Sequence, residues 1–580
     1  MERPSNLEIK SLISGAITAS LFGLWPQWAT AQSAGQVDRE AQRILEQQQQ
    51  QVRDRAEQFD RSRMRPPSGE EAQAPDATGL RGNGCVAVRE VRLTGADRYP
   101  AGSFADVVAP LRGDCVGTDA IDAALRAITD RYVRDGFVTT RAVVGPQDLK
   151  PGVLTITVIE GRIGGIEGAG SSKHYGAGEI GAAFPTRAGD RLNLRALEQG
   201  VDQLARMAKG DPKIDIVPGA APGTSTVLIA RQPLSRWLRP AVLINNEGAA
   251  STGRWQASAS VDADSLLGIA DSWSFYYQGI ASKDRERRNT AYGGFASLPR
   301  GWWTLSLAAG YSAYHSILAG HGLRFATRGC TVTGSATLDR MMFRDARNKL
   351  ALSAGLSLLD TRNLIQGIAL RTSSYRIVSG SVGVRWQRRL GETQLSLSGG
   401  YDQGLGLLGA HTVDTGPGGA TGRYHRVTFD VGAQTPFTIG RSRLINALVL
   451  RGQAAFDNVF PADRLSLGGS STVRGFRDDG ISGRTGVALR EQLGFGIVDL
   501  ARAQPELATS LSGYLAYDAG AIRPVRDDHF ERGLLQSGSA GLMMRSRHVQ
   551  AEVAAAIPVT APAWVRHPKA LFSTSIRILL

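Results

Sequence analysis

The second half of the chain alternates apolar and polar side chains with a period of two. A strand that crosses a membrane within a β-barrel produces this pattern, since one face meets lipid and the other a polar lumen. Turn-rich spacers such as residues 416–419 separate the alternating segments. The pattern predicts a membrane β-barrel. The apolar positions that share a face in its clearest segments are Trp273, Phe275 and Tyr277; Trp303, Leu305 and Leu307; Leu395, Leu397 and Tyr401; Val427, Phe429 and Val431; and Ile576, Ile578 and Leu580.

One strand of this barrel carries a carboxylate among its polar positions. Between residues 511 and 518, Leu515 and Tyr517 share one parity, whereas Tyr514 and Asp518 share the other. Leu515 suits the lipid face of the wall. We therefore expect Asp518 to face the lumen.

A glycine-rich segment, residues 465–476, supplies a basic partner for this carboxylate. Its glycines permit a sharp fold back toward the barrel. Arg474, near its end, carries a planar guanidinium that can bind a carboxylate through two parallel hydrogen bonds. We expect Arg474 and Asp518 to meet. The alternative is a solvated extracellular loop in which Arg474 has no specific partner.

Upstream of the barrel, the pattern from residue 85 to about residue 168 is that of a small α/β domain. Apolar residues fall at helical spacing over residues 118–132. Strands are predicted over residues 86–91, 137–144 and 153–159. One face of the helix is therefore expected to pack on a small sheet.

A second module follows, from Arg162 to about Pro233. It repeats the order of the first, with a helix predicted over residues 194–204 and a strand over residues 226–230. Exposed strand edges in such small sheets can accept an extended peptide, because backbone pairing makes little demand on sequence. The pair of modules is therefore suited to an unfolded client.

Two motifs combine these observations. Val473, Arg474, Gly475 and Phe476 end the glycine-rich segment, and Tyr517, Asp518, Ala519 and Gly520 end the strand that carries the carboxylate. With the paired modules, they resemble the outer-membrane transporters of two-partner secretion, the haemolysin-activator type with POTRA domains. The resemblance covers nearly the whole sequence. It implies that the first motif is the tip of a loop tucked into the lumen, and that Arg474 contacts Asp518 in a wall motif formed with Tyr517 and Gly520.

The resemblance also implies an architecture and a function. The fold is expected to be a barrel of sixteen antiparallel strands, preceded by two small α/β POTRA modules at residues 85–161 and 162–235 and by an N-terminal plug helix. Sixteen strands over residues 236–580 leave roughly 21 to 22 residues for each strand and connection. The implied function is recognition of an unfolded exoprotein of the haemolysin, adhesin or toxin type in the periplasm, and its export through the pore without ATP. An insertase that assembles other barrels and a passive porin are the alternatives.

The first residues predict export. Lys10 precedes an apolar stretch over residues 12–25, and Ala29-Thr30-Ala31 has the form of a cleavage site, so residues 1–31 are expected to be a signal peptide. A membrane anchor is the alternative, although the stretch is short for one. Export and a barrel together predict the outer membrane, with the modules in the periplasm.

Residues 32–63 carry a sparse apolar stripe within a polar run that includes five consecutive glutamines. Such a weak apolar face does not support a globular core, so a flexible, part-helical leader is one interpretation. The family resemblance suggests instead a plug helix that lies in the lumen and leaves for transport. A proline-containing linker over residues 64–84 would let such a helix travel.

The cysteines fit an exported protein. Cys85 and Cys115 both lie in the first module, and we expect a disulfide between them, worth about 3 to 4 kcal/mol in the chain-entropy model. Cys330 lies alone in the barrel half and is expected to be unpaired.

The formal net charge of +14 is best explained by a solvated surface with no specific anionic partner. The basic residues are dispersed and not interleaved with stacking aromatics, so no nucleic-acid partner is predicted. Lipopolysaccharide in the outer-membrane lipid and an acidic cargo are the specific partners to consider, beside a solvated surface with none. No catalytic constellation, cofactor site or metal-ligand spacing is evident. The C-terminal Leu580 departs from the aromatic residue that usually ends outer-membrane proteins.

Overall fold

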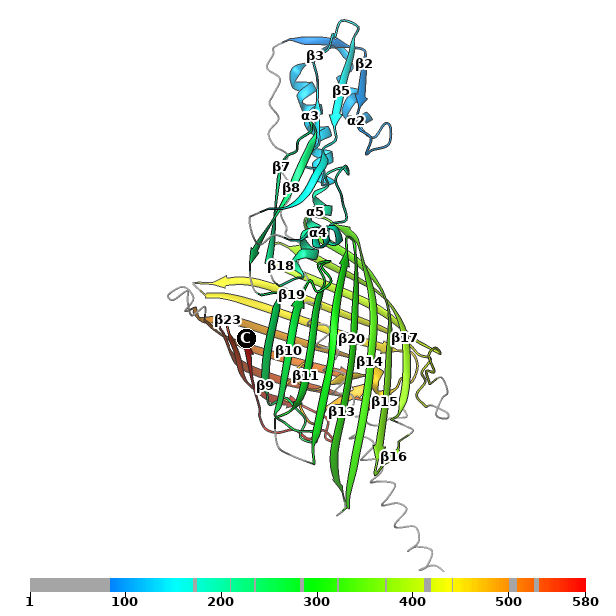
Figure 1. Cartoon of the computed structure of the whole chain (residues 1–580), viewed down its shortest axis with the longest axis vertical. Coiled ribbons are helices and arrows are strands. Elements are labelled where there is room, and N and C mark those ends of the chain that lie inside the picture. Colours follow the sequence, from blue (N-terminus) through cyan, green and yellow to red (C-terminus); the bar gives the residue numbers. More distant parts are fainter. Residues whose placement is uncertain are drawn as a thin grey trace, which may run out of the picture.

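The computed structural model describes residues 84–580 except for residues 170–174, 209, 234–235, 282–285, 321–322, 371–372, 412–418, 441, 500–508 and 526–530. The predicted signal peptide (1–31), N-terminal helix (32–63) and, apart from Gly84, linker (64–84) lie outside the described residues. The described part consists of two α/β modules followed by a β-barrel (Figure 1). No helix within it is both long enough and apolar enough to cross a bilayer.

Sixteen antiparallel strands form a closed barrel, which confirms the predicted fold. Each strand pairs with the next along the chain, and β27 pairs with β9 to close the ring. A short extra strand, β16 (Ile368–Ala369), extends the end of β15. The barrel strands are β9 (Leu238–Asn245), β10 (Gln256–Asp264), β11 (Ser272–Ile280), β12 (Arg288–Arg300), β13 (Trp303–Gly320), β14 (Leu323–Arg344), β15 (Asn348–Ile365), β17 (Tyr375–Leu390), β18 (Thr393–Leu405), β19 (His425–Ile439), β20 (Ser442–Ala455), β23 (Thr485–Asp499), β24 (Ser510–Ile522), β25 (Gly533–Arg545), β26 (Val549–Thr560) and β27 (Leu571–Leu579).

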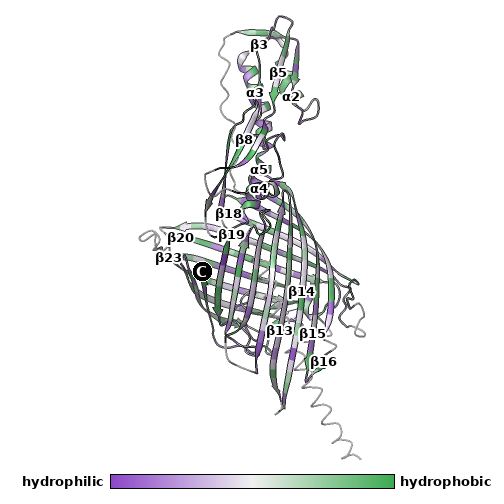
Figure 2. Ribbon diagram, viewed as in Figure 1, coloured by the Kyte–Doolittle hydropathy of each residue, from purple (hydrophilic) through white to green (hydrophobic). Residues whose placement is uncertain are grey.

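The outer face of the barrel wall carries apolar side chains, and the face toward the lumen carries polar ones. On β24, the side chains of Leu515 and Tyr517 are exposed on the outer face, whereas Tyr514 and Asp518 are buried on the lumen side. Apolar and polar residues accordingly alternate along the barrel strands (Figure 2). The alternation in the sequence therefore gave the correct face for this strand.

The first module contains two small sheets and a central helix. β1 (Cys85–Val88) pairs with β3 (Gly113–Gly117), and β5 (Val153–Ile159) lies between β2 (Glu90–Thr94) and β4 (Arg141–Val143). Helix α3 (Thr118–Arg134) contributes Ile128 and Tyr132 to the core, where they meet Leu154 and Ile156 of β5. All four of these side chains are fully buried. A short helix α2 (Ala105–Val108) and a 3-10 turn η1 (Ala109–Leu111) complete the module.

Two strand predictions in this module are wrong in extent. The strand predicted over residues 86–91 is divided at Arg89, because β1 and β2 join different sheets. The strand predicted over residues 137–144 is reduced to β4. Phe137 instead closes helix α3, with its backbone N–H donating to the oxygen of Tyr132 (2.8 Å) and its ring in the module core. Periodicity alone cannot separate such a short apolar run from a strand.

The disulfide between Cys85 and Cys115 is present and joins β1 to β3. It closes a segment whose ends are 30 residues apart in sequence. The pair thus holds together a two-stranded sheet that is too small to be stable alone. Cys330 is free.

The second module is a three-stranded sheet with two helices. β8 (Thr224–Pro233) lies between β6 (Arg162–Ala169) and β7 (Gly210–Pro218). Helix α5 (Leu194–Ala205) begins at Asn193, whose side chain accepts from the backbone N–H groups of residues 195 and 196. α4 (Ala177–Ala183) packs beside it. The core gathers fully buried apolar residues from both helices and the sheet: Ala183, Leu197, Leu204, Val227 and Ile229.

Glu160 joins the two modules. Its carboxylate accepts from Arg191 Nε of the second module and from the hydroxyl of Tyr132 (2.9 Å) and the backbone of Arg98 (2.7 Å) in the first. Burial alone would raise the pKa of Glu160, but these hydrogen bonds and the charge of Arg191 outweigh burial and hold the pKa below its usual value. The backbone N–H of Leu194 also donates to the oxygen of Gly136 (2.7 Å). The junction is therefore bonded through both side chains and backbone.

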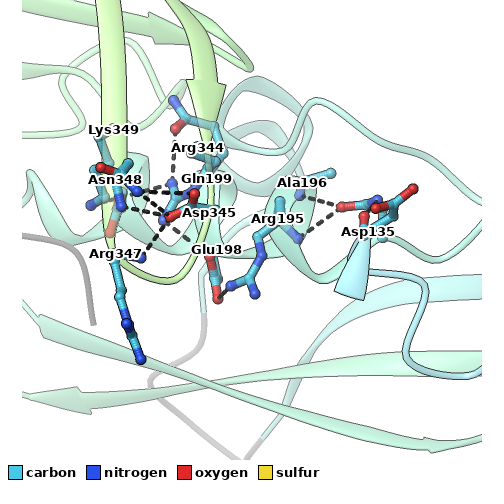
Figure 3. Close-up of polar contacts among 12 residues, drawn as sticks. Asp135, Arg195, Ala196, Glu198, Gln199, Arg344, Asp345, Arg347, Asn348 and Lys349 are labelled. Atoms are coloured by element: carbon cyan, nitrogen blue, oxygen red, sulfur yellow. Dashed lines mark hydrogen bonds and ion pairs between the residues drawn. The ribbon is translucent and has the colours of Figure 1, made fainter. Parts of the chain in front are cut away.

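Helix α5 also joins the second module to the barrel (Figure 3). The side-chain amides of Gln199 and Gln203 both donate to the backbone oxygen of Gly301, in the turn between β12 and β13, at 3.2 and 3.0 Å. Arg344, at the end of β14, donates to Gln199 (3.0 Å) and to Asp202 (2.9 Å). The guanidinium is only 5% exposed, so these bonds form away from bulk water. The second module is thus attached to the rim of the barrel by buried hydrogen bonds.

Candidate functional site in the barrel lumen

The loop between β20 and β23, residues 456–484, folds back against the inner wall. Two short strands within it, β21 (Leu465–Leu467) and β22 (Ile481–Gly483), pair antiparallel and hold its base, after a 3-10 turn η2 (Pro461–Asp463). Gly468 and Gly475 have φ angles of 127° and 97°, which favour glycine. The backbone N–H of Gly469 donates to the oxygen of Phe476 (2.8 Å) and closes the turn. The glycines thus shape the loop tip, which we call the lumen loop.

Arg474 at the tip of the lumen loop meets Asp518 on β24. The guanidinium donates through Nε to Oδ2 (2.7 Å) and through Nη2 to Oδ1 (2.8 Å), which is the bidentate geometry expected of this pair. The backbone N–H of Arg474 adds a third bond to Oδ2 (3.1 Å). The Asp518 side chain is fully buried, and that of Arg474 is 12% exposed. The structure therefore brings together the two residues expected to meet; a role as a lock stays a prediction.

Apolar contacts support the same geometry. Val473 and Phe476, which flank Arg474 and Gly475 in the loop motif, are buried in a cluster with Leu467 of the same loop and with wall residues such as Ala488 and Ile522. Gly520 of the wall motif makes this packing possible. A Cβ atom there would lie 2.9 Å from Leu467 Cδ1 and 3.1 Å from Val473 Cγ2, closer than side chains normally approach. The loop therefore packs where the wall has no side chain.

Tyr517 of the wall motif lies apart from the lumen loop. Its side chain is 42% exposed on the outer face, and its hydroxyl accepts a hydrogen bond from Gln536 (2.6 Å). The strand alternation requires this, since Tyr517 and Asp518 are adjacent. Tyr517 thus belongs to the lipid-facing side of the motif.

Three further residues of the site were missed from the sequence. Arg474 Nη1 donates to Gln492 (3.3 Å), and its guanidinium carbon lies 5.5 Å from the ring centre of Tyr514. Arg490 brings a second guanidinium, with Nε 3.6 Å from Asp518 Oδ1. Arg490 and Asp518 are register partners on β23 and β24. Arg490 and Gln492 lie at alternate positions of β23 and therefore share one face, which the sequence pattern can show. The pairing of β23 with β24, which brings them beside Asp518, cannot be derived from one sequence.

The lumen loop has a second attachment beyond Asp518. Asp478 accepts from the backbone N–H of Ala250 (2.8 Å) and pairs with Arg254 (3.0 Å), both in the connection between β9 and β10. Arg477 donates to the backbone oxygen of Phe572 at the start of β27 (3.1 Å). The loop therefore contacts both the connection between the first two strands and the last strand of the barrel. Such contacts hold the loop in position.

Comparison with known proteins gives this arrangement its family. A family model described as haemolysin secretion/activation protein ShlB/FhaC/HecB matches residues 223–544, more than half of the chain. Models described as a POTRA domain of the ShlB type and as a POTRA domain match residues 86–161 and 162–218. The chain belongs to the haemolysin secretion/activation family.

Relatives agree with this assignment. The outer membrane transporter CdiB of Escherichia coli is 32% identical over 83% of this chain and 80% of its own. The hemolysin transporter protein ShlB of Serratia marcescens is 28% identical over 77% of each chain.

Solved structures agree as well. CdiB from Escherichia coli has a TM-score of 0.83 at 29% identity, over 94% of this chain and 98% of that one. CdiB from Acinetobacter baumannii, at 20% identity and a TM-score of 0.75 over 93% and 98% of the two chains, has the same fold.

The family fixes the class and location of the protein. It is an outer-membrane transporter of two-partner secretion, with its barrel in the outer membrane and its POTRA modules in the periplasm. The barrel end that holds the modules is therefore periplasmic, and the lumen loop comes from the extracellular end. The comparisons favour neither the insertase nor the porin, and the family is one of transporters.

Proposed function

We propose that this transporter captures a large unfolded exoprotein in the periplasm, exports it through the barrel, and uses Arg474 and Asp518 as a lumen lock. The lock holds the lumen loop against the wall between rounds of transport. The observation that supports it is the full burial of the Asp518 carboxylate beneath a bidentate arginine from a loop. The Val473–Phe476 motif and Gly520 serve this contact.

A buried pair of this kind favours a defined position more than it adds stability. Removing two charges from water offsets much of their attraction, so the net gain is small. Leaving a buried charge with no partner at all costs about 3 to 5 kcal/mol. A loop held this way has two distinct states, docked and released, which is what a transport cycle needs.

The exoprotein is proposed to bind the POTRA modules by adding a strand. Among the described strands, β2 pairs only with β5 and β7 only with β8, so each presents one edge. Backbone pairing at such an edge needs little sequence specificity, which suits an unfolded client. The relatives include a protein named a hemolysin transporter, and haemolysins, adhesins and toxins are the proposed partner types.

Export is proposed to run without ATP, with folding of the exoprotein outside the cell supplying direction. We assign no catalytic residue, cofactor, metal or nucleic acid to the process. A plug helix at residues 32–63 that leaves the lumen for transport is part of the same proposal, and a signal peptide at residues 1–31 precedes it.

Secretion of an exoprotein from the neighbouring reading frame tests the transporter. Deleting the chain should abolish its appearance in the medium, and the intact chain should restore it. Unchanged secretion combined with outer-membrane assembly defects would refute export and favour the insertase.

The lock is tested in the same assay. Arg474→Ala and Asp518→Ala should each impair secretion while the barrel still inserts, as judged by heat-modifiable migration of the folded barrel. Arg547→Ala is the matched control, because Arg547 is an exposed residue in the turn between β25 and β26. Wild-type secretion by either lock variant refutes the lock and leaves the transporter intact.

A photo-crosslinking residue tests capture by the modules. Placed at Asp215, an exposed position on the edge strand β7, it should crosslink to the exoprotein. Placed at Asp130, an exposed position on helix α3, it should not. Equal yields at the two positions would contradict strand addition at β7.

A further inference from the structure

The outer face of strands β11–β14 carries a row of three tyrosines that ends at a valine. Tyr277, Tyr292, Tyr311 and Val332 are successive register partners across the four strands. The rings of Tyr292 and Tyr311 lie 5.2 Å apart, and Tyr277 and Tyr292 are about half exposed. Tyrosines on the lipid face of a barrel gather where hydrocarbon meets headgroups. This row therefore marks the extracellular edge of the apolar band.

Beyond this row, strands β12–β15 continue away from the POTRA modules, and the β13–β14 hairpin reaches farther than its neighbours (Figure 1). Three arginines and one histidine gather there. Arg288, His315 and Arg328 are consecutive register partners on β12, β13 and β14. Arg362 on β15 pairs in register with Cys330, two residues from Arg328. We call Arg288, Arg328 and Arg362 the outer arginine patch.

The patch faces away from the lumen. Thr327 and Asn363, which neighbour Arg328 and Arg362 in sequence, are buried on the inner side of the wall. Successive side chains of a strand point to opposite faces, so both arginines point outward. All three guanidinium groups are exposed.

Among the described residues, no acidic side chain neutralises the patch. The nearby described acidic groups are engaged elsewhere, since Glu286 pairs with Arg324 (2.6 Å) and Asp360 with Arg376 (2.5 Å). Within the described part of the chain, none of the three patch arginines forms an ion pair or a hydrogen bond through its side chain. Nδ1 of His315 is buried between them without a hydrogen-bond partner there. Like charges on neighbouring strands repel, so this arrangement calls for an external anion.

We propose that the outer arginine patch binds the phosphate groups of an outer-leaflet glycolipid, the lipid A part of lipopolysaccharide. Guanidinium groups bind phosphate oxygens bidentately, and three of them match a headgroup that carries two phosphates. The acyl chains of that lipid would lie against the apolar band below the tyrosine row.

The depth of the patch favours a lipid over the exported protein. Its members lie two to four residues beyond the aromatic row in register. At about 3.3 Å per residue and a strand tilt of about 40°, this is about 5 to 10 Å along the membrane normal. Headgroups occupy that layer. An exoprotein passing through the lumen would not meet side chains on the outer face.

Lipid A binding to the full-length protein in detergent, followed by native mass spectrometry, tests the proposal. Combined substitution of Arg288→Gln, Arg328→Gln and Arg362→Gln should weaken binding of bisphosphorylated lipid A at least tenfold. Arg328→Gln alone is a milder variant that keeps the test valid if the triple variant inserts poorly. Arg340→Gln is the matched control, because it lies on the outer face of the same strand at the periplasmic end, against Trp303. It should leave binding unchanged.

Other probes separate the sources of binding. Dephosphorylated lipid A should bind the wild type as weakly as the triple variant binds the intact lipid, and millimolar inorganic phosphate should not displace lipid A. Equal binding by wild type and by the triple and single variants overturns the proposal. So does displacement by inorganic phosphate, which would indicate a site for the free ion. Loss of secretion with unchanged lipid A binding would assign the patch to the exoprotein and overturn it as well.

Discussion

Asp518→Ala should release the lumen loop more strongly than Arg474→Ala. Without Arg474, the carboxylate keeps Arg490, whose Nε is already 3.6 Å away, so one charged partner remains. Without Asp518, two guanidinium groups lie in the same buried region with no carboxylate between them. We expect the docked loop to lose about 3 to 5 kcal/mol in Asp518→Ala, the range for an unpaired buried charge. Arg474→Ala should lose about 1.5 to 3 kcal/mol, the range for a hydrogen bond to a charged group.

These energies translate into the time that the loop spends undocked. Since about 1.4 kcal/mol is a factor of ten, Asp518→Ala should raise the released fraction by about 100-fold or more, and Arg474→Ala by about tenfold to 100-fold. Val473→Cys in a Cys330→Ser background reports this fraction, because position 473 is fully buried when the loop is docked. The rate of labelling by a membrane-impermeant maleimide should follow the stated order. Equal rates, or a faster rate in Arg474→Ala, would refute the assignment of Arg490 as a second partner.

Three further predictions concern the wall, the module junction and the disulfide. Gly520→Val should displace the lumen loop and raise the same labelling rate, because a Cβ atom there would lie 2.9 Å from Leu467; Gly538→Val, where a Cβ atom meets nothing within 4 Å, is the control. The pKa of Glu160 is depressed, so its contribution to the junction is present above the ordinary carboxyl pKa of about 4.3 and is lost as the pH falls through the lower folded value. Spin-label distances between the modules should broaden in that acidic range, and Glu160→Gln should remove the dependence. Cys85→Ser should destabilise the first module by about 3 to 4 kcal/mol in calorimetry, while an unchanged first transition would show that β1 and β3 need no covalent link.

The faces of the barrel were predictable because lipid imposes a strict alternation on every strand. The inward position of Asp518 followed from the parity of Leu515 and Tyr517 alone. Contacts between strands were not predictable, since the sequence does not state the register that brings Arg490 beside Asp518. The predicted contact between Arg474 and the wall rested on a motif and a family resemblance, not on residue spacing.

The POTRA modules show a different limit. The apolar spacing predicts helix α3, but it also places Phe137 in a strand, whereas Phe137 follows the end of the helix at Arg134; one apolar run fits both structures. The contact of helix α5 with the barrel was not predictable from the sequence, since Gln199 and Gln203 have the pattern of ordinary polar helix residues. Their amides both donate to the backbone oxygen of Gly301, about 100 positions later in the chain.

The attachments of the lumen loop also set an order for assembly. Its partners are spread along the barrel, from Ala250, 228 residues before Asp478, to Phe572, 95 residues after Arg477. Contacts of such long sequence separation form late in folding, after the intervening strands are in place. The loop can therefore dock fully only when the first hairpin, β24 and β27 already belong to one closed ring. A docked lumen loop is consequently a sign that the barrel has closed. A barrel that has not yet closed would still have its lumen loop undocked.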